Sequence, residues 1–245
     1  MEKPVPSLRQ ALNRPYWLPA EFSALLLLVP GYVAVAQLTS VRAHPAPRVS
    51  LDSLFPLIPG WLLVYAALYL FLIILPIFVL TERTLIRRAV WCYLSIWSLS
   101  LTVFAIYPTE ISRPALVPGD GFAAWGLRML YQADPPHNCF PSLHVAHSFT
   151  SALICRKVSH RLGNFALICA ALVALSTLYT RQHQIADLIT GAALAWLACR
   201  LLLPASAIGG DHLSERTTLN LAAVAAAAAL LSLFGFWAAW TLEVL

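Results

Sequence analysis

The chain has 245 residues, of which 60% are hydrophobic and only 11% are charged, and its formal net charge is +5. A soluble globular domain carries about 25% charged residues, so this composition excludes an ordinary soluble enzyme and indicates an integral membrane protein. The basic residues are spread over short polar segments. They form no patch of the kind that binds nucleic acid, so we expect no nucleic-acid partner.

Long apolar segments recur from one end of the chain to the other. A helix needs about 20 mostly apolar residues to cross a bilayer, and long apolar runs without strand alternation satisfy their backbone hydrogen bonds as helices. We therefore predict an all-α membrane protein with one polytopic domain over residues 1–245. The predicted spans are 20–39, 55–80, 89–107, 142–156, 162–180, 184–204 and 218–242. The fourth is the shortest and the most polar at its start.

Basic residues are unequally shared between the two sides of this arrangement, eleven on one side and five on the other. The eleven are Lys3, Arg9, Arg14, Arg83, Arg87, Arg88, Arg156, Lys157, Arg161, Arg200 and Arg216; the five are Arg42, Arg48, Arg113, Arg128 and Arg181. Cytoplasmic loops collect Lys and Arg. We therefore expect a cytoplasmic N-terminus, with the loops 40–54, 108–141 and 181–183 facing outward. The expected location is a bacterial inner membrane, with the site on its periplasmic side.

Polar and ionisable residues gather in three segments that this topology places at the same outer face. They are "YPTEISRP" at 107–114, "DPPHNCFPSLHVAHS" at 134–148 and "STLYTRQHQIADLITG" at 176–191. Ionisable residues near membrane spans are costly and usually functional. Their joint position predicts a functional site at this face.

Two histidines and an aspartate in these segments suit proton transfer and nucleophilic attack. His183 and Asp187 are spaced i and i+4, so they share a helix face. A carboxylate that accepts the Nδ1–H of an imidazole fixes its tautomer and leaves Nε2 free as a nucleophile or base. His144 lies at another predicted helix start and would serve as the complementary acid.

The same segments contain groups that suit a phosphate. Arg113 and Arg181 are planar, permanently charged donors. Pro141 and Ser142 indicate a helix start, and free N–H groups at such a start favour an anion. Together with the histidines and the aspartate, these residues suit phosphoryl transfer without a metal or any other cofactor.

Each feature also has a simpler reading. The His183–Asp187 pair could be a structural hydrogen bond, Arg113 could anchor lipid headgroups, and Ser142 could only cap its helix. His147 is three residues after His144, and this HxxH spacing could suggest a metal site, although no glutamate of a zinc-protease pattern accompanies it. Only one cysteine, Cys139, lies in a loop, so no disulfide framework is expected.

The ordered motifs resemble those of the type 2 phosphatidic acid phosphatase superfamily, whose signatures read KxxxxxxRP, PSGH and SRxxxxxHxxxD. Arg113-Pro114 matches the end of the first, Pro141-Ser142-Leu143-His144 matches the second except at its glycine, and Ser176 through His183 to Asp187 matches the third except at its arginine. The resemblance covers about residues 105–195. It implies a metal-free membrane core of six helices, to which the last span would add a seventh.

The resemblance also implies roles for individual residues. His183 would form a phosphohistidine, Asp187 would orient it, His144 would protonate the leaving group, and Arg113 and Ser142 would hold the phosphate. Ile106 and Thr177 stand where the signatures have a lysine and an arginine, and Leu143 stands where they have a glycine. Arg181 would supply the missing charge.

"FPSLHVA" followed by "RQH" resembles the branch of this superfamily that contains inositol phosphorylceramide synthases and bacterial phosphatase-like proteins. The expected function is therefore a phosphatase that acts on a lipid phosphate or diphosphate in the bilayer. The main alternative is a lipid phosphotransferase on the same scaffold. A non-catalytic lipid-binding or transport protein and a metal-dependent hydrolase remain as lesser alternatives.

Overall fold

The computed structural model describes residues 7–203 and 213–242, so Lys3 and the last residue of the predicted sixth span lie outside the described residues. The helices are α1 (Leu8–Leu12), α2 (Glu21–Thr39), α3 (Trp61–Val79), α4 (Arg83–Ile106), α5 (Phe122–Ala133), α6 (Leu143–Arg156), α7 (His160–Tyr179), α8 (Ile185–Leu202) and α9 (Glu215–Thr241). Two 3₁₀ turns, Ser40–Arg42 and Ser50–Leu54, and two short strands, β1 (His44–Pro45) and β2 (Thr109–Glu110), lie in the loops.

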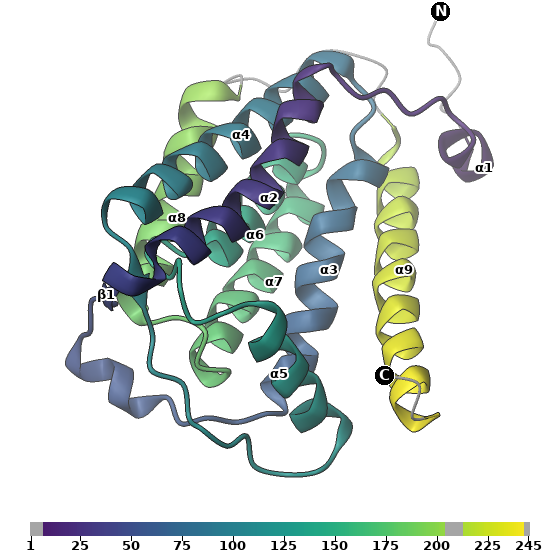
Figure 1. Ribbon diagram of the computed structural model, residues 1–245. Helices are drawn as coiled ribbons and strands as arrows, with labels where there is room; N and C mark the ends of the chain where they lie inside the picture. Colours follow the sequence, from purple (N-terminus) through teal and green to yellow (C-terminus); the bar gives the residue numbers. More distant parts are fainter. Residues whose placement is uncertain (1–6, 204–212, 243–245) are drawn as a thin grey trace, which may run out of the picture.

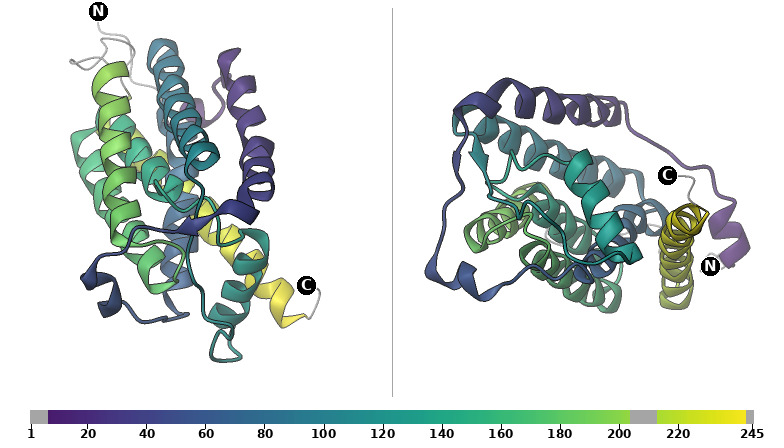
Figure 2. Two further views of the ribbon diagram at one scale, coloured as in Figure 1. Left: turned by 60° about the vertical axis from the view of Figure 1, so that its left-hand side comes forward. Right: turned by 60° about the horizontal axis from the view of Figure 1, so that its bottom comes forward.

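The helices α2, α3, α4, α6, α7, α8 and α9 pack together, and Figures 1 and 2 show the bundle that they form. The central helix is α6, which packs against α3, α4, α7 and α8, while α2 lies against α4 and α9 lies against α3 at the edge. This arrangement confirms the predicted fold, a six-helix core with a seventh helix at its C-terminal end. The core is apolar and close-packed around residues such as Leu72, Val145, Ile154 and Val173, all of which are fully buried.

Six of the seven bundle helices in the described part are long and apolar enough to cross a membrane. The exception is α6, with only 14 residues, which corresponds to the predicted fourth span. A helix rises 1.5 Å per residue, so α6 is too short to cross a hydrocarbon core of about 30 Å. Other helices surround α6, so protein also encloses the irregular segment of chain that leads into it. Backbone without regular structure is tolerated at membrane depth when it is buried in protein.

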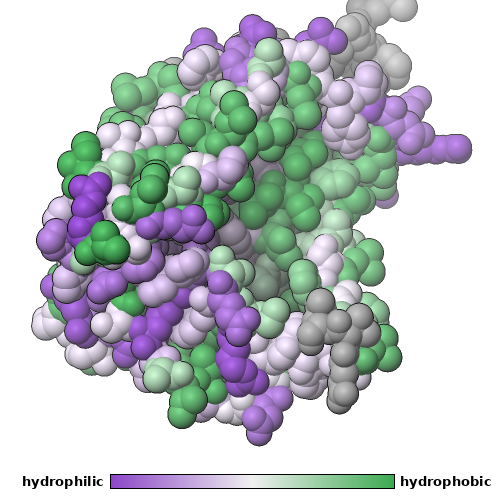
Figure 3. All heavy atoms as spheres, in the orientation of Figure 1, coloured by the Kyte–Doolittle hydropathy of each residue, from purple (hydrophilic) through white to green (hydrophobic). Residues whose placement is uncertain are grey.

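Large apolar side chains cover the outside of the bundle. Leu27 of α2, Trp196 and Leu201 of α8 and Leu231 of α9 are all largely exposed. Figure 3 shows this hydrophobic surface over the helices and a hydrophilic region below it, where the loops gather. Contiguous apolar surface of this extent indicates contact with lipid, as expected for a multi-pass membrane protein.

The long loop 108–141 is more ordered than the sequence predicted. It contains α5, an amphipathic helix that lies across one end of the bundle and packs on α3 (Figure 1). The contact is close, because a Cβ on Gly126 of α5 would approach the side chain of Leu62 to 2.7 Å. The strands β1 and β2 pair in parallel and join loop 40–54 to the start of the same long loop.

The third predicted span begins earlier than expected, at Arg83 rather than at residue 89. The carboxylate of Glu82 caps this helix by accepting hydrogen bonds from the backbone N–H groups of Thr84 and Leu85, at 2.9 and 2.6 Å. Partial burial raises the pKa of Glu82, but these hydrogen bonds outweigh it and leave the pKa below its usual value. Capping thus extends the helix into its basic first turns.

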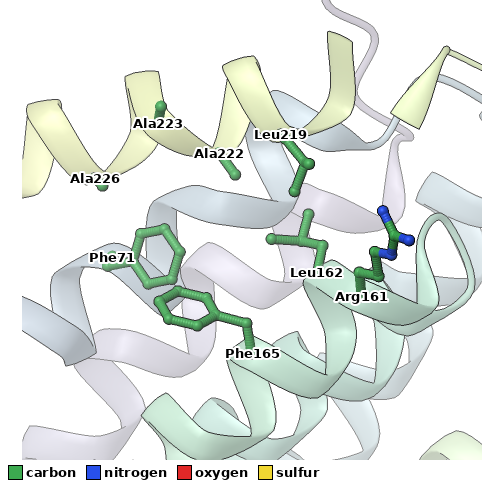
Figure 4. Close-up of a pocket in the computed structure, with 8 residues that line it drawn as sticks. All are labelled: Phe71, Arg161, Leu162, Phe165, Leu219, Ala222, Ala223 and Ala226. Carbon is green, nitrogen blue, oxygen red and sulfur yellow. The ribbon is translucent and has the colours of Figure 1, made fainter. Parts of the chain in front are cut away.

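An apolar groove of about 410 Å³ opens between α9, α3 and α7 (Figure 4). Phe71, Leu162, Phe165 and Ala222 are among the residues that line it. Arg161 lies at its rim and forms an ion pair of 3.3 Å with Glu215. The groove contains none of the candidate site residues, which lie at the other end of α7.

Candidate active site

The three polar segments converge at one end of the bundle. Backbone hydrogen bonds join the first segment to the second, because Ile111 N–H donates to Pro136 O at 3.0 Å and Phe140 N–H donates to the Thr109 hydroxyl at 3.0 Å. The second segment is joined to the third, because Ser142 N–H donates to Asp187 O at 3.1 Å. The loops 40–54, 108–141 and 181–183 lie together at this end (Figure 1).

His183, Asp187 and His144 form a continuous line of polar contacts. His183 Nδ1 is 3.4 Å from Asp187 Oδ2, and His183 Nε2 is 3.0 Å from His144 Nδ1. Asp187 is fully buried and His183 is only 6% exposed. If Asp187 attracts the Nδ1–H of His183, then Nε2 of that ring is an acceptor, and the proton in the second contact belongs to His144 Nδ1.

The position of His183 is set by the turn between α7 and α8. The backbone N–H groups of Gln182 and His183 donate to Thr177 O, at 2.9 and 3.3 Å. Arg181 adopts a left-handed conformation with φ of 50°, which reverses the chain between the two helices. Asp187 Oδ2 accepts a hydrogen bond from Gln184 N–H at 2.9 Å, so the residue that contacts His183 also caps the helix that follows it.

His144 is held in an aromatic slot in the first turn of α6. The rings of Tyr65 and Tyr69, both from α3, meet it edge to face, at centroid distances of 5.5 and 5.2 Å. Packing against two large rings restricts the imidazole to few orientations. One of these orientations directs Nδ1 toward His183.

Ser142 is the N-cap of α6, and its hydroxyl accepts a hydrogen bond from Val145 N–H at 3.3 Å. Its backbone lies directly against α8, where Gly191 is the contact residue. A Cβ at position 191 would come within 2.5 Å of Ser142 O. Glycine therefore allows the second and third segments to approach each other closely.

Gly191→Ala is expected to push the start of α6 away from α8 and so separate the two histidines. Overpacking of this kind costs about 1–3 kcal/mol of stability, and we expect a clear fall in thermal unfolding temperature and in activity. Gly235→Ala is the matched control, because a Cβ at Gly235 in α9 meets nothing within 4 Å. Equal behaviour of the two variants would contradict the proposed role of this contact.

Arg113 is anchored by the second segment and by α5. Its Nη1 donates to Asp134 O at 2.6 Å, and its guanidinium lies 4.5 Å from the centroid of the Tyr131 ring. The Nε of Arg113 is buried and has no protein partner. Arg113 makes no hydrogen bond with either histidine, and the buried N–H of its Nε remains unused.

Arg181 lies in the turn between α7 and α8, directly before the residues that lead to His183. Its side chain is partly exposed and makes no hydrogen bond or ion pair with the described part of the chain. Tyr131, against which Arg113 packs, donates its hydroxyl to Thr180 O at 2.7 Å, next to Arg181 in the chain. Burial raises the pKa of Tyr131 to about 12, and the positive charges of Arg113 and Arg181 lower that pKa by a smaller amount.

The remaining polar residues of these segments have other partners. The His147 ring stacks on Tyr93 at 4.6 Å, and no group of three or more His, Cys, Asp or Glu side chains in residues 7–203 and 213–242 is arranged to hold a metal ion. Cys139 lies in the loop 108–141, as predicted, but its side chain is only 2% exposed. Burial raises the pKa of its thiol well above the usual value.

Sequence reasoning missed two residues at this end of the bundle. Asp52 is buried and accepts a hydrogen bond from Ile185 N–H at 2.9 Å. Tyr131 joins Arg113 to Thr180, as described above. The sequence gives only weak signals for either residue. Asp52 is the one acidic residue of its loop, and Tyr131 lies on a short amphipathic segment.

The chain was also compared with known proteins. A family model described as the PAP2 superfamily matches residues 57–201, which is more than half of the chain and includes all three polar segments. Neither the curated proteins nor the solved structures gave a match. The family match agrees with the all-α membrane bundle described above. The chain therefore belongs to the PAP2 superfamily, the type 2 phosphatidic acid phosphatases, whose members have phosphatase-type activity.

Proposed function

We propose that this protein is a metal-independent phosphatase that acts on a lipid phosphate or diphosphate through a phosphohistidine on His183. The observation that carries the proposal is the line from Asp187 through His183 to His144, with contacts of 3.4 and 3.0 Å. In the proposal, His183 is the nucleophile, the Asp187 carboxylate beside its Nδ1 orients the ring, and His144 at its Nε2 is the acid. A membrane-embedded bundle around this line suits a substrate with a lipid tail.

In the first step, His183 Nε2 attacks the phosphorus atom and an N–P bond forms. The bond between phosphorus and the leaving oxygen breaks, and His144, which enters this step as the imidazolium, gives its Nδ1 proton to that oxygen and becomes neutral. The leaving group departs as an alcohol or as a phosphate. The proton on His183 Nδ1 stays against Asp187, which stabilises the positive charge on the ring. The substrate phosphate must enter between the two imidazoles, so their direct contact is replaced when the substrate binds.

In the second step, His144 takes a proton from a water molecule as the water oxygen attacks phosphorus. The N–P bond breaks, inorganic phosphate leaves, and both histidines return to their starting protonation states. Splitting the displacement in this way replaces one difficult step by two easier ones. An alcohol group of a second lipid in place of water would give a phosphotransferase with the same first step.

Phosphate binding in this proposal uses Arg113 and the start of α6. Arg113 has a buried Nε without a protein partner, and guanidinium N–H groups match phosphate oxygens in geometry and charge. Ser142 caps α6, and the positive end of the helix dipole favours an anion. Arg181 is free of other partners and is available to the same phosphate from the third segment.

The experiment that tests the proposal is phosphate release by the purified, detergent-solubilised protein from a panel of lipid phosphates and diphosphates. EDTA is present throughout, and rapid denaturation traps any phosphoprotein. The proposal predicts release that is insensitive to EDTA and a trapped phosphoryl group that is labile in acid and stable in alkali, as phosphohistidine is. An activity that is lost in EDTA would instead indicate a metal-dependent hydrolase.

A second outcome separates hydrolysis from transfer. If the folded protein traps a phosphoryl group but releases no phosphate until an acceptor lipid is added, the protein is a phosphotransferase. If it neither traps nor releases phosphate with any member of the panel or any acceptor, the catalytic proposal fails. Binding of the panel without turnover would then support a non-catalytic lipid-binding protein.

We further propose that the site faces the extracytoplasmic side, because basic residues concentrate at the opposite end of the bundle. Arg14, Arg87, Arg88 and Arg161 all contact groups at that end, including Leu80 O, Glu21, Leu202 O and Glu215. Cytoplasmic ends of membrane helices carry this excess of basic residues.

Cysteine labelling checks this orientation. The five native cysteines are all buried, so the wild-type protein should react weakly with a membrane-impermeant maleimide. Leu116→Cys introduces a thiol at a position that is 84% exposed at the site end, and His160→Cys introduces one at the exposed opposite end. We expect intact spheroplasts to label only Leu116→Cys, and lysed membranes to label both. The reverse pattern would place the site in the cytoplasm.

A further inference from the structure

We propose that Asp52, in the loop between α2 and α3, is a positioning residue that holds His183 in line with His144. This inference rests on the proposed function, because it assigns a residue to the same site. Asp52 lies more than 130 positions before His183 in the chain, and no motif described above includes it. Its placement beside the third segment is a result of the fold alone.

The carboxylate of Asp52 makes two backbone contacts from a buried position. Oδ1 accepts a hydrogen bond from Ile185 N–H at 2.9 Å, and Oδ2 accepts one from Val49 N–H at 2.7 Å. Asp52 is only 5% exposed. A buried carboxylate is stable only when its oxygens are hydrogen-bonded, and both oxygens of Asp52 have such partners.

Two carboxylates cap the start of α8 together. Asp187 Oδ2 accepts from Gln184 N–H at 2.9 Å, and Asp52 Oδ1 accepts from the next N–H, that of Ile185. These are orphan donors of the first helical turn, and negative charge at this end of a helix is favourable. When the side-chain amide of Gln184 is oriented with its nitrogen toward the loop that carries Asp52, it donates to Asp52 Oδ2 at 3.2 Å and to Pro47 O at 3.0 Å.

His183 directly precedes these capped residues. Before it, the chain is held by Thr177 O, which accepts from His183 N–H at 3.3 Å, a weaker contact than that to Ile185. The start of α8 therefore fixes the backbone of His183, and Asp52 fixes the start of α8. Without Asp52, the Ile185 N–H would lose its partner in a partly buried setting, and this turn would shift or fray.

The loop that carries Asp52 is itself attached to two of the three polar segments. Ala46 N–H donates to Glu110 O at 2.8 Å in the first segment, and Ile58 N–H donates to Tyr179 O at 2.9 Å in the third segment, at the end of α7. The loop 44–58 thus forms a strap across the site end of the bundle. Asp52 is the residue through which this strap contacts the start of α8, next to the nucleophile.

The test compares Asp52→Ala, Asp52→Asn and Asp120→Ala, with kcat and KM measured per folded molecule. A displacement of about 1 Å near reacting groups can cost about 100-fold in rate. We expect kcat to fall by about 10- to 100-fold in Asp52→Ala, with little change in KM. Asp52→Asn keeps one carbonyl acceptor for Ile185 and should recover part of the loss. Asp120, an exposed aspartate of loop 108–141, is the matched control.

A double-mutant cycle with Ile185→Pro isolates the hydrogen bond. Ile185 is the first residue of α8, where proline is tolerated and where its missing N–H removes the partner of Asp52. If Asp52 acts through this N–H, Asp52→Ala should have little further effect on kcat in the Ile185→Pro background. Additive effects of the two substitutions would overturn the proposal, as would an unchanged kcat in Asp52→Ala.

Hydrogen exchange separates this inference from the proposed function. The amides of residues 182–188 should exchange faster in Asp52→Ala than in Asp120→Ala, whether or not a substrate has been found. If the wild-type protein has no activity, the proposed function fails, and faster exchange still supports the Asp52 link. Unchanged exchange at these amides overturns the link, even where the wild-type protein is active.

Discussion

His183→Ala is expected to reduce phosphate release by at least about 10⁴-fold, because the substitution removes the atom that would form the covalent intermediate. No other described histidine can replace it in the same geometry. His144 contacts it through Nδ1 at 3.0 Å but lacks a carboxylate partner of its own. The trapped acid-labile phosphoprotein should disappear together with the activity.

The control for this variant is His160→Ala, which removes an exposed histidine at the other end of α7 and should leave the activity unchanged. Both proteins are compared by thermal unfolding in detergent, so that a loss of fold is not mistaken for a loss of chemistry. Residual activity of His183→Ala within about tenfold of the wild type would exclude His183 as the nucleophile. Trapping of the phosphoryl group on His144 would reverse the two assigned roles.

Asp187→Asn is expected to lower kcat by about 10³- to 10⁴-fold, because it replaces the carboxylate beside the His183 ring with a neutral amide. Asp187 Oδ2 contacts both His183 Nδ1, at 3.4 Å, and Gln184 N–H, at 2.9 Å. An amide nitrogen at this position would hold the ring proton of His183 on Nε2 and would remove the cap. A carbonyl oxygen there would keep the cap, but the negative charge that stabilises the protonated ring would be lost.

Asp187→Ala removes both the helix cap and the acceptor for His183 Nδ1. We expect this variant to lose activity to a similar extent as Asp187→Asn. We also expect it to unfold at a lower temperature, because the loss of a helix cap lowers the free energy of unfolding by about 1 kcal/mol. An active Asp187→Asn protein would show that the His183–Asp187 contact is structural. An inactive protein that still forms the phosphoenzyme would place Asp187 in the second step.

The fold class could be read from the sequence because it depends on local composition. The apolar runs predicted seven helices, and α2, α3, α4, α6, α7, α8 and α9 are all present. The helix boundaries were less certain, since they depend on capping by single residues such as Glu82. The amphipathic helix α5 was missed, because its 12 residues are too few for a membrane span and stand inside a polar loop.

The motif residues of the candidate site could also be named from the sequence, because their chemistry and spacing are visible in the chain. His183 and Asp187 are one helical turn apart, and Ser142 stands at a helix start. Their roles remain predictions that the experiments above test. The role of Arg181 as a phosphate ligand also stays a prediction.

The sequence by itself determined that this protein is a helical membrane bundle with polar segments at one face, because hydropathy and spacing are local properties. Only the tertiary structure decided how those segments meet. The 3.0 Å contact between His144 and His183, the close approach of Ser142 to Gly191 and the capping of Ile185 by Asp52 all join residues that are far apart in the chain. Such contacts depend on how the helices pack, and packing is settled by the whole core at once.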